Sequence, residues 1–108
     1  MVKILNMSHP LSSEAKEQIA SLTGTALSNV VEILLPVQLD MDGDISKQLA
    51  DLYQEVKAEI PFGFYVPPAL SFASAYIARR LANGAFAPGM IVLKGVGTPR
   101  RFVVAEVV

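Results

Sequence analysis

The segment Val2-Lys3-Ile4-Leu5-Asn6-Met7-Ser8-His9-Pro10 decides the fold, because a short apolar run is followed at once by a polar turn. The run Val2-Lys3-Ile4-Leu5 is typical of the first strand of an α/β sheet. Ligands of open α/β sheets gather outside the carboxyl ends of the strands. Asn6, Ser8 and His9, the only histidine, would offer hydrogen-bond donors, acceptors and one group that titrates near neutrality there. We therefore expect function at the turn after the first strand.

Strand-like and helix-like segments alternate along the rest of the chain. Short β-branched or apolar runs predict strands, and apolar residues at helical spacing predict helices. The expected strands are 2–5, 30–35, 62–66, 90–93 and 101–107. The expected helices are 12–22, 44–59 and 69–83. The order βαβαβαββ predicts one domain over 1–108 with a small Rossmann-like α/β fold. Its sheet would be mostly parallel, with helices on both faces and a C-terminal antiparallel hairpin.

Cap and breaker residues suggest where the helices begin and end. Ser12 or Ser13 can cap the first helix, Gly24 can stop it, and Asp44 can cap the second. We expect Ala15, Ile19 and Leu22 to form the buried stripe of the first helix. The third helix is rich in alanine and therefore slim, and Pro67-Pro68 suits a strand-to-helix turn with a proline in the first helical turn. Residues 95–99 predict the turn of the C-terminal hairpin.

Composition narrows the possible functions. Hydrophobic residues make up 52% of the 108 residues and charged residues 18%, so we expect another subunit to cover part of the surface. The net charge of -1 argues against binding duplex nucleic acid, which needs many Lys and Arg contacts to phosphates. The lack of cysteine excludes disulfides and zinc-thiolate sites. No run approaches the roughly 20 apolar residues of a membrane helix, and we expect a cytoplasmic protein without membrane contact.

Two turns are the candidate binding site. If the first and third strands are neighbours, residues 6–12 face the segment Val66-Pro67-Pro68-Ala69-Leu70-Ser71 across a crevice. Asn6 and Ser8 could bind an adenine edge or a phosphate, and free N–H groups at the start of the third helix could bind an anion, with the Ser71 hydroxyl beside them. Alternatively, Ser8 and His9 only satisfy hydrogen-bonding groups of the loop, and Ser71 caps the helix. His9 lacks an evident carboxylate partner, so a catalytic role is not indicated by sequence alone.

Other motifs give no metal or cofactor site. Asp40-x-Asp42-Gly43-Asp44 has its glycine one place too early for a calcium loop, so we expect its acids to cap the second helix. Gly95-x-Gly97 joins two strands and is not a phosphate loop. Arg79-Arg80 would complement the dipole at the end of the third helix. Arg100-Arg101 could reach a phosphate or a partner subunit.

Five segments of the chain together carry a resemblance to a known family. They are Ile4-Leu5-Asn6-Met7-Ser8-His9-Pro10-Leu11, Val37-Gln38-Leu39-Asp40, Val66-Pro67-Pro68-Ala69-Leu70-Ser71, Leu81-Ala82-Asn83-Gly84 and Pro88-Gly89-Met90-Ile91-Val92-Leu93. These segments resemble a family of small stand-alone CRISPR-associated proteins of type III systems. The family is related to the CARF (CRISPR-associated Rossmann-fold) sensor domains, and related families include ring nucleases. The resemblance implies a homodimer that binds cyclic oligoadenylate, chiefly cyclic tetra-adenylate, across its two-fold axis. This chain has Pro67-Pro68 where the family shows Pro-Gly, and Ala82-Asn83-Gly84 where it shows leucine-histidine-glycine. We therefore carry no catalytic role to that helix end.

The expected function is binding of cyclic tetra-adenylate by a homodimer, or a higher assembly, that lowers the level of this messenger by sequestration. The ligand-binding candidates are Asn6, Ser8, His9, Pro67, Pro68 and Ser71. A first alternative is a metal-independent ring nuclease, in which a 2′-hydroxyl of the ring attacks the adjacent phosphate. His9 would then shuttle the proton, and Ser8 would stabilise the phosphate oxygens. A second alternative is a non-catalytic subunit of a larger assembly.

Overall fold

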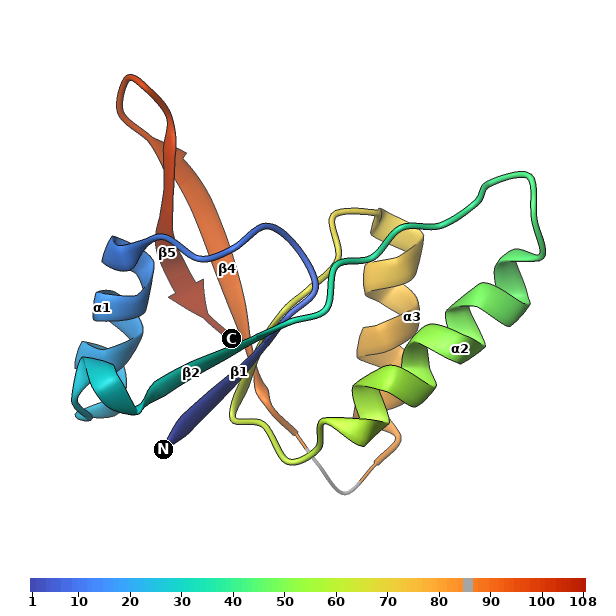
Figure 1. The fold of residues 1–108 in the computed structure, drawn as a ribbon, viewed down its shortest axis with the longest axis horizontal. Coiled ribbons are helices and arrows are strands. Elements are labelled where there is room, and N and C mark those ends of the chain that lie inside the picture. The colour runs from blue at the N-terminus through green and yellow to red at the C-terminus, as the bar shows by residue number, and fades with distance from the viewer. Residues whose placement is uncertain (85–86) are drawn as a thin grey trace.

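Five strands form one sheet in the order β2-β1-β3-β4-β5 in this computed structural model, which describes residues 1–84 and 87–108 (Figure 1). The strands are β1 (Val2–Asn6), β2 (Val30–Leu34), β3 (Phe64–Val66), β4 (Gly89–Val96) and β5 (Arg101–Val107). The helices are α1 (Ser13–Thr23), α2 (Ile45–Ala58) and α3 (Ser71–Ala82), with a 3-10 turn at Leu27–Asn29. The first four strands pair in parallel, and β5 is antiparallel to β4. The predicted small Rossmann-like fold with a mostly parallel sheet is confirmed.

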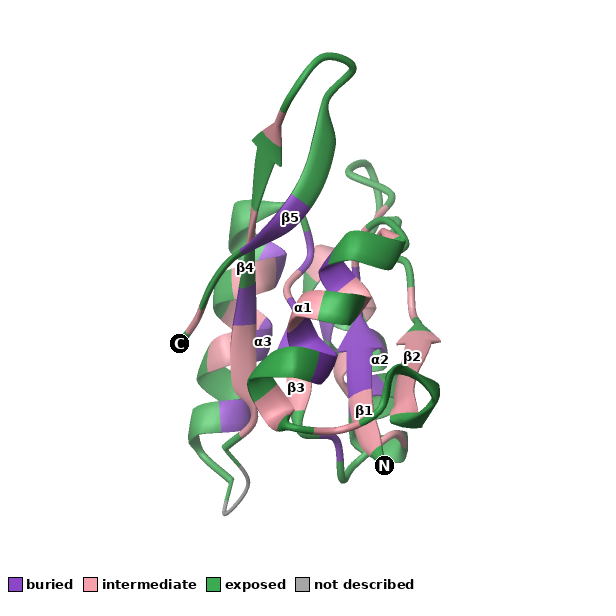
Figure 2. Ribbon diagram, turned by 90° about the vertical axis from the view of Figure 1, so that its left-hand side faces the viewer, coloured by how far each residue is buried: buried purple, intermediate pink, exposed green. Residues whose placement is uncertain are grey.

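Helices cover both faces of the sheet, with α1 on one side and α2 and α3 on the other (Figure 1). Successive residues of a strand point to opposite faces. Ile4 accordingly packs into the cluster beneath α1, and Leu5 packs into the cluster beneath α2 and α3. Both side chains are fully buried, and the ribbon of β1 is coloured as buried along much of its length in Figure 2. The apolar run that predicted the first strand thus belongs to both halves of the core.

The predicted caps of the first two helices are confirmed. The Ser12 hydroxyl accepts a hydrogen bond from the amide of Ala15, and Gly24 ends α1 with a φ of 67°. Asp44 caps α2 by accepting from the amide of Lys47. The prediction that Leu22 is buried is wrong, because this side chain is 66% exposed. It lies in a surface groove beside the outer strand β5, and Ala20 takes the buried place in the last turn of α1.

Three predicted boundaries also differ from the structure. Helix α3 begins at Ser71, so Pro67 and Pro68 precede the helix and do not lie in its first turn. A proline disfavours the helical conformation of the residue that precedes it, and this effect keeps the segment extended. Strand β3 is limited to Phe64–Val66, and β4 continues to Val96, so the hairpin turn is only residues 97–100.

The middle of the outer edge of β5 is covered by polar side chains of α1 and of its N-cap residue. The amide of Val104 donates to the Gln18 carboxamide oxygen at 2.8 Å, and the Gln18 nitrogen donates to the carbonyl of Val104 at 3.4 Å. The Ser12 hydroxyl donates to the carbonyl of Phe102. An unpaired edge strand is a template for pairing with other chains, and these bonds block it.

We expect Gln18→Ala to lower the free energy of unfolding by about 1–2 kcal/mol, because two edge groups of Val104 lose their partner. Urea denaturation measures the change. Gln54→Ala is the matched control, since Gln54 is exposed on α2. Equal stability of the two variants would show that the contact with Val104 contributes nothing.

No helix within residues 1–84 and 87–108 is long and apolar enough to cross a bilayer.

Candidate functional site

The candidate site lies at the ends of β1 and β3, where the connections leave the sheet toward opposite faces. Strand β1 lies between β2 and β3, so the condition that the first and third strands are neighbours is met, and the helices that follow β1 and β3 cover opposite faces (Figure 1). Their connecting loops therefore diverge and leave a crevice, which is the usual ligand position in such sheets. Two backbone bonds hold the end of β1. The amide of Met7 donates to the carbonyl of Val66 at 3.0 Å, and the amide of Leu35 donates to the carbonyl of Asn6 at 2.8 Å.

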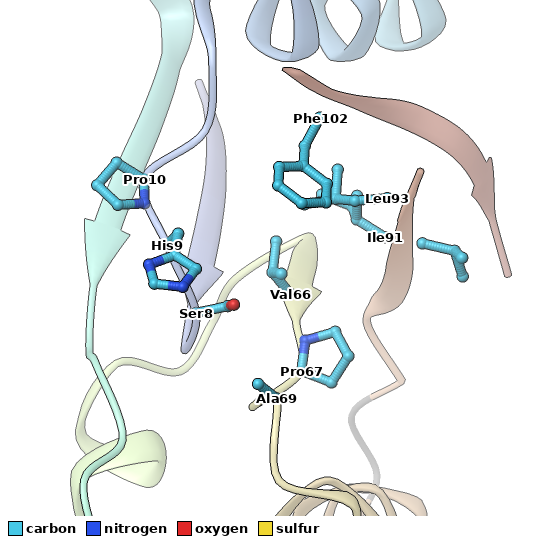
Figure 3. A pocket seen from close by; sticks show the side chains of 10 residues that line it. Ser8, His9, Pro10, Val66, Pro67, Ala69, Ile91, Leu93 and Phe102 are labelled. Carbon is cyan, nitrogen blue, oxygen red and sulfur yellow. The ribbon is translucent and has the colours of Figure 1, made fainter. Parts of the chain in front are cut away.

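The larger cavity of the crevice, called here the main cavity, has a volume of about 380 Å³. One wall is formed by Ser8, His9 and Pro10 of the first loop, defined as residues 7–12. Figure 3 shows Val66, Pro67 and Ala69 of β3 and the following turn, together with Ile91, Leu93 and Phe102 of the hairpin, around the same space. Val92 also lines the cavity, and none of the lining residues that the structure describes is Lys, Arg, Asp or Glu. The cavity is suited to a flat apolar group with a few hydrogen bonds at its edge.

A second cavity of about 260 Å³ lies on the other side of the first loop. It is lined by Met7, Ser8, His9, Pro36, Val37, Gln38, Pro68, Ala69 and Leu70. Ser8, His9 and Ala69 line both cavities. We define the β3–α3 turn as residues 67–70. The first loop and this turn thus separate the two cavities.

Asn6 lies beneath the site and does not form its wall. Its side chain is fully buried, and its amide nitrogen donates to the Glu32 carboxylate at 2.6 Å and to the carbonyl of His9 at 2.7 Å. Its amide oxygen accepts from the backbone amide of Ser8 at 2.9 Å. Asn6, a predicted ligand-binding residue, thus uses its amide nitrogen and oxygen within the protein to shape the first loop.

Glu32 of β2 is the carboxylate that supports this loop. Its side chain is 8% exposed, and it accepts from the backbone amide of Leu11 at 2.9 Å as well as from Asn6. Lys16 forms an ion pair with it at 3.3 Å and supplies the compensating charge. Sequence reasoning missed Glu32. The available signal was a single acid within the otherwise apolar run Val30-Val31-Glu32-Ile33-Leu34-Leu35.

Ser8 and His9 are the predicted polar residues that lie on the walls of both cavities. His9 is exposed, and its imidazole has no hydrogen-bond or ion-pair partner within residues 1–84 and 87–108. Ser8 is half-buried beside it, with its hydroxyl drawn toward the cavity in Figure 3. A general base needs a partner that orients it, and the Glu32 carboxylate is occupied by Asn6, Leu11 and Lys16.

The two prolines of the β3–α3 turn line different cavities. Pro67 lines the main cavity, and Pro68 lines the second cavity. Ser71 lines neither of these two cavities and is exposed in the first turn of α3. It is not the cap of the helix either, because Leu70 holds that position without a side-chain hydrogen bond.

Nearby ionisable groups do not form a metal site. The part of the chain that the structure describes contains no group of three or more His, Cys, Asp or Glu that could hold an ion. The Asp40 and Asp44 carboxylates instead accept hydrogen bonds from the amides of Asp42 and Lys47. Burial raises the pKa of the Tyr65 phenol, so this β3 side chain stays neutral beneath the site.

Comparison with known proteins gives no relative: the sequence matches no protein-family model, and no curated protein or solved structure matches it.

Proposed function

We propose that the chain binds cyclic tetra-adenylate, the messenger of type III CRISPR systems, and lowers its free level in the cytoplasm by sequestration. The observation that supports this most is the main cavity, which combines apolar walls with Ser8 and His9. An adenine ring presents flat faces to such walls and polar edges to such side chains. The free N–H groups at the start of α3 lie next to the β3–α3 turn and would favour a phosphate.

The size of the cavity favours a ligand shared between two copies of the chain. A volume of 380 Å³ is near the lower end of the range of about 300–1,000 Å³ for small-molecule sites. It suits one nucleoside better than a ring of four nucleotides. A two-fold homodimer would present the cavity twice, and the symmetry of the ring would match that arrangement.

Sequestration is favoured over cleavage because no carboxylate among the described residues bonds to His9 and orients it. The ring-nuclease alternative is supported by a different observation, since Ser8 and His9 are adjacent on the cavity wall. A ring held in line could react through its own 2′-hydroxyl, with His9 taking the proton and Ser8 donating to a phosphate oxygen.

A thermal-shift assay with product analysis tests the proposal. We expect cyclic tetra-adenylate to raise the melting temperature, because a ligand that binds only the folded state stabilises it by mass action. The ring should be recovered intact after incubation in molar excess over the protein. Linear products formed over many turnovers would replace sequestration with the nuclease alternative. An unchanged melting temperature with every cyclic oligoadenylate would favour the subunit of a larger assembly.

A further inference from the structure

The main cavity has a wall on the β4–β5 hairpin, which projects beyond the rest of the sheet (Figures 1 and 2). We call residues 93–104 the arm. Leu93 is paired with Val104, and Gly95 is paired with Phe102. Residues that face each other across an antiparallel pair, and residues two apart on one strand, point to the same side of the sheet. Because Leu93 and Phe102 line the main cavity, Gly95 lies on the cavity side of the arm.

The side chain of Arg100 lies across Gly95. A Cβ atom at residue 95 would be 2.7 Å from the Cδ atom of Arg100 and 2.9 Å from its Nε atom. Contacts this short do not occur, so the missing side chain of Gly95 leaves the space in which the stem of Arg100 rests. Gly95 therefore leaves room for the arginine stem on the side of the arm that carries Phe102. The Arg100 side chain therefore lies on the same side of the arm as Leu93 and Phe102, which line the main cavity.

Arg100 also has a free charge. It forms no ion pair or hydrogen bond with residues 1–84 or 87–108 through its side chain, and it is exposed. The adjacent Arg101 differs, since it donates to Glu14 at 2.7 Å. The described residues that line the main cavity include no Lys or Arg. A negatively charged ligand there would lack a counter-charge unless the arm supplied one.

We infer that Arg100 binds a phosphate of a nucleotide whose base occupies the main cavity. The ligand class is thus a base joined to at least one phosphate, and a nucleoside alone would leave the guanidinium unused. A guanidinium presents a planar fork of donors that matches phosphate oxygens. This inference rests on the proposed function and adds the residue that recognises the anionic part of the ligand.

The test compares dissociation constants of Arg100→Gln and Gly95→Ala for cyclic tetra-adenylate with that of the unaltered protein. We expect Arg100→Gln to weaken binding about tenfold or more, as loss of a charge-assisted hydrogen bond does. Gly95→Ala should weaken it in the same direction, because its methyl group displaces the arginine. The unaltered protein should also lose more affinity than Arg100→Gln between low and moderate salt.

Arg79→Gln is the matched control, because Arg79 is exposed in the last turn of α3, at the end of the helix away from the β3–α3 turn. Its affinity should stay within twofold of the unaltered protein. If Arg100→Gln also binds the ring within twofold, the inference fails and the proposed function stands. If the unaltered protein binds ATP in an Arg100-dependent manner but not the ring, the proposed function fails and the inference stands. Failure to bind either ligand overturns both.

Discussion

Asn6→Ala is expected to lower the free energy of unfolding by about 3 kcal/mol, one of the largest effects in the chain. The side chain is fully buried, and three hydrogen bonds join it to Glu32, His9 and Ser8. Its removal leaves the buried Glu32 carboxylate with one fewer donor and frees the first loop. Chemical denaturation measures the loss, and Asn29→Ala, an exposed asparagine outside the network, should change stability by less than about 0.5 kcal/mol.

Asn6→Asp separates the loss of hydrogen bonds from the loss of shape. The aspartate side chain has the same shape, but one of its oxygens replaces the amide nitrogen of Asn6. That nitrogen is 2.6 Å from the Glu32 carboxylate, so the new oxygen would face it at the same place. One of the two facing carboxyl groups must take up a proton for both to remain buried. The stability lost should therefore be larger at pH 7 than at pH 4, relative to the unaltered protein at each pH. An equal loss at both values would mean that Glu32 and residue 6 do not face each other.

Ala69→Trp is expected to weaken binding of cyclic tetra-adenylate by about 100-fold or more, the largest functional effect that we predict. Ala69 lines both cavities and is exposed, so a bulky side chain there would fill space that the ligand needs. The folded core should change little because the new ring replaces solvent. Dissociation constants and melting temperatures measured on the same preparations separate the two effects.

Ala75→Trp is the matched control for this steric test. Ala75 is also an exposed alanine, within α3, and lines neither cavity of the candidate site. Its affinity should equal that of the unaltered protein. If Ala69→Trp binds the ring as tightly as Ala75→Trp does, the ligand lies elsewhere on the molecule.

The elements of the fold could be predicted because their signals are local. The caps Ser12 and Asp44 and the αL glycine at residue 24 act on their own helices. The exposure of Leu22 could not be predicted in this way, because it depends on where the edge strand β5 passes α1. The start of α3 was misplaced by two residues, because helical composition continues through residues 69–70 while the backbone is still extended at Leu70.

The position of the candidate site followed from the strand order, but the roles of its residues did not. Adjacency of β1 and β3 brings the first loop and the β3–α3 turn together. Asn6 was assigned to the ligand because its partner Glu32 is 26 residues away and only the parallel pairing of β1 and β2 brings them together. The contribution of Phe102 was also missed, since it depends on the length of β4 beyond Leu93. Long-range pairing therefore sets the part of the site that sequence patterns leave open.

The most direct measurement is a calorimetric titration of the protein with cyclic tetra-adenylate, followed by chromatography of the ring. The account predicts saturation at one ring per two chains and recovery of the ring unchanged. Absence of binding, or saturation at one ring per chain, would contradict a cavity that forms half of a shared, symmetric site.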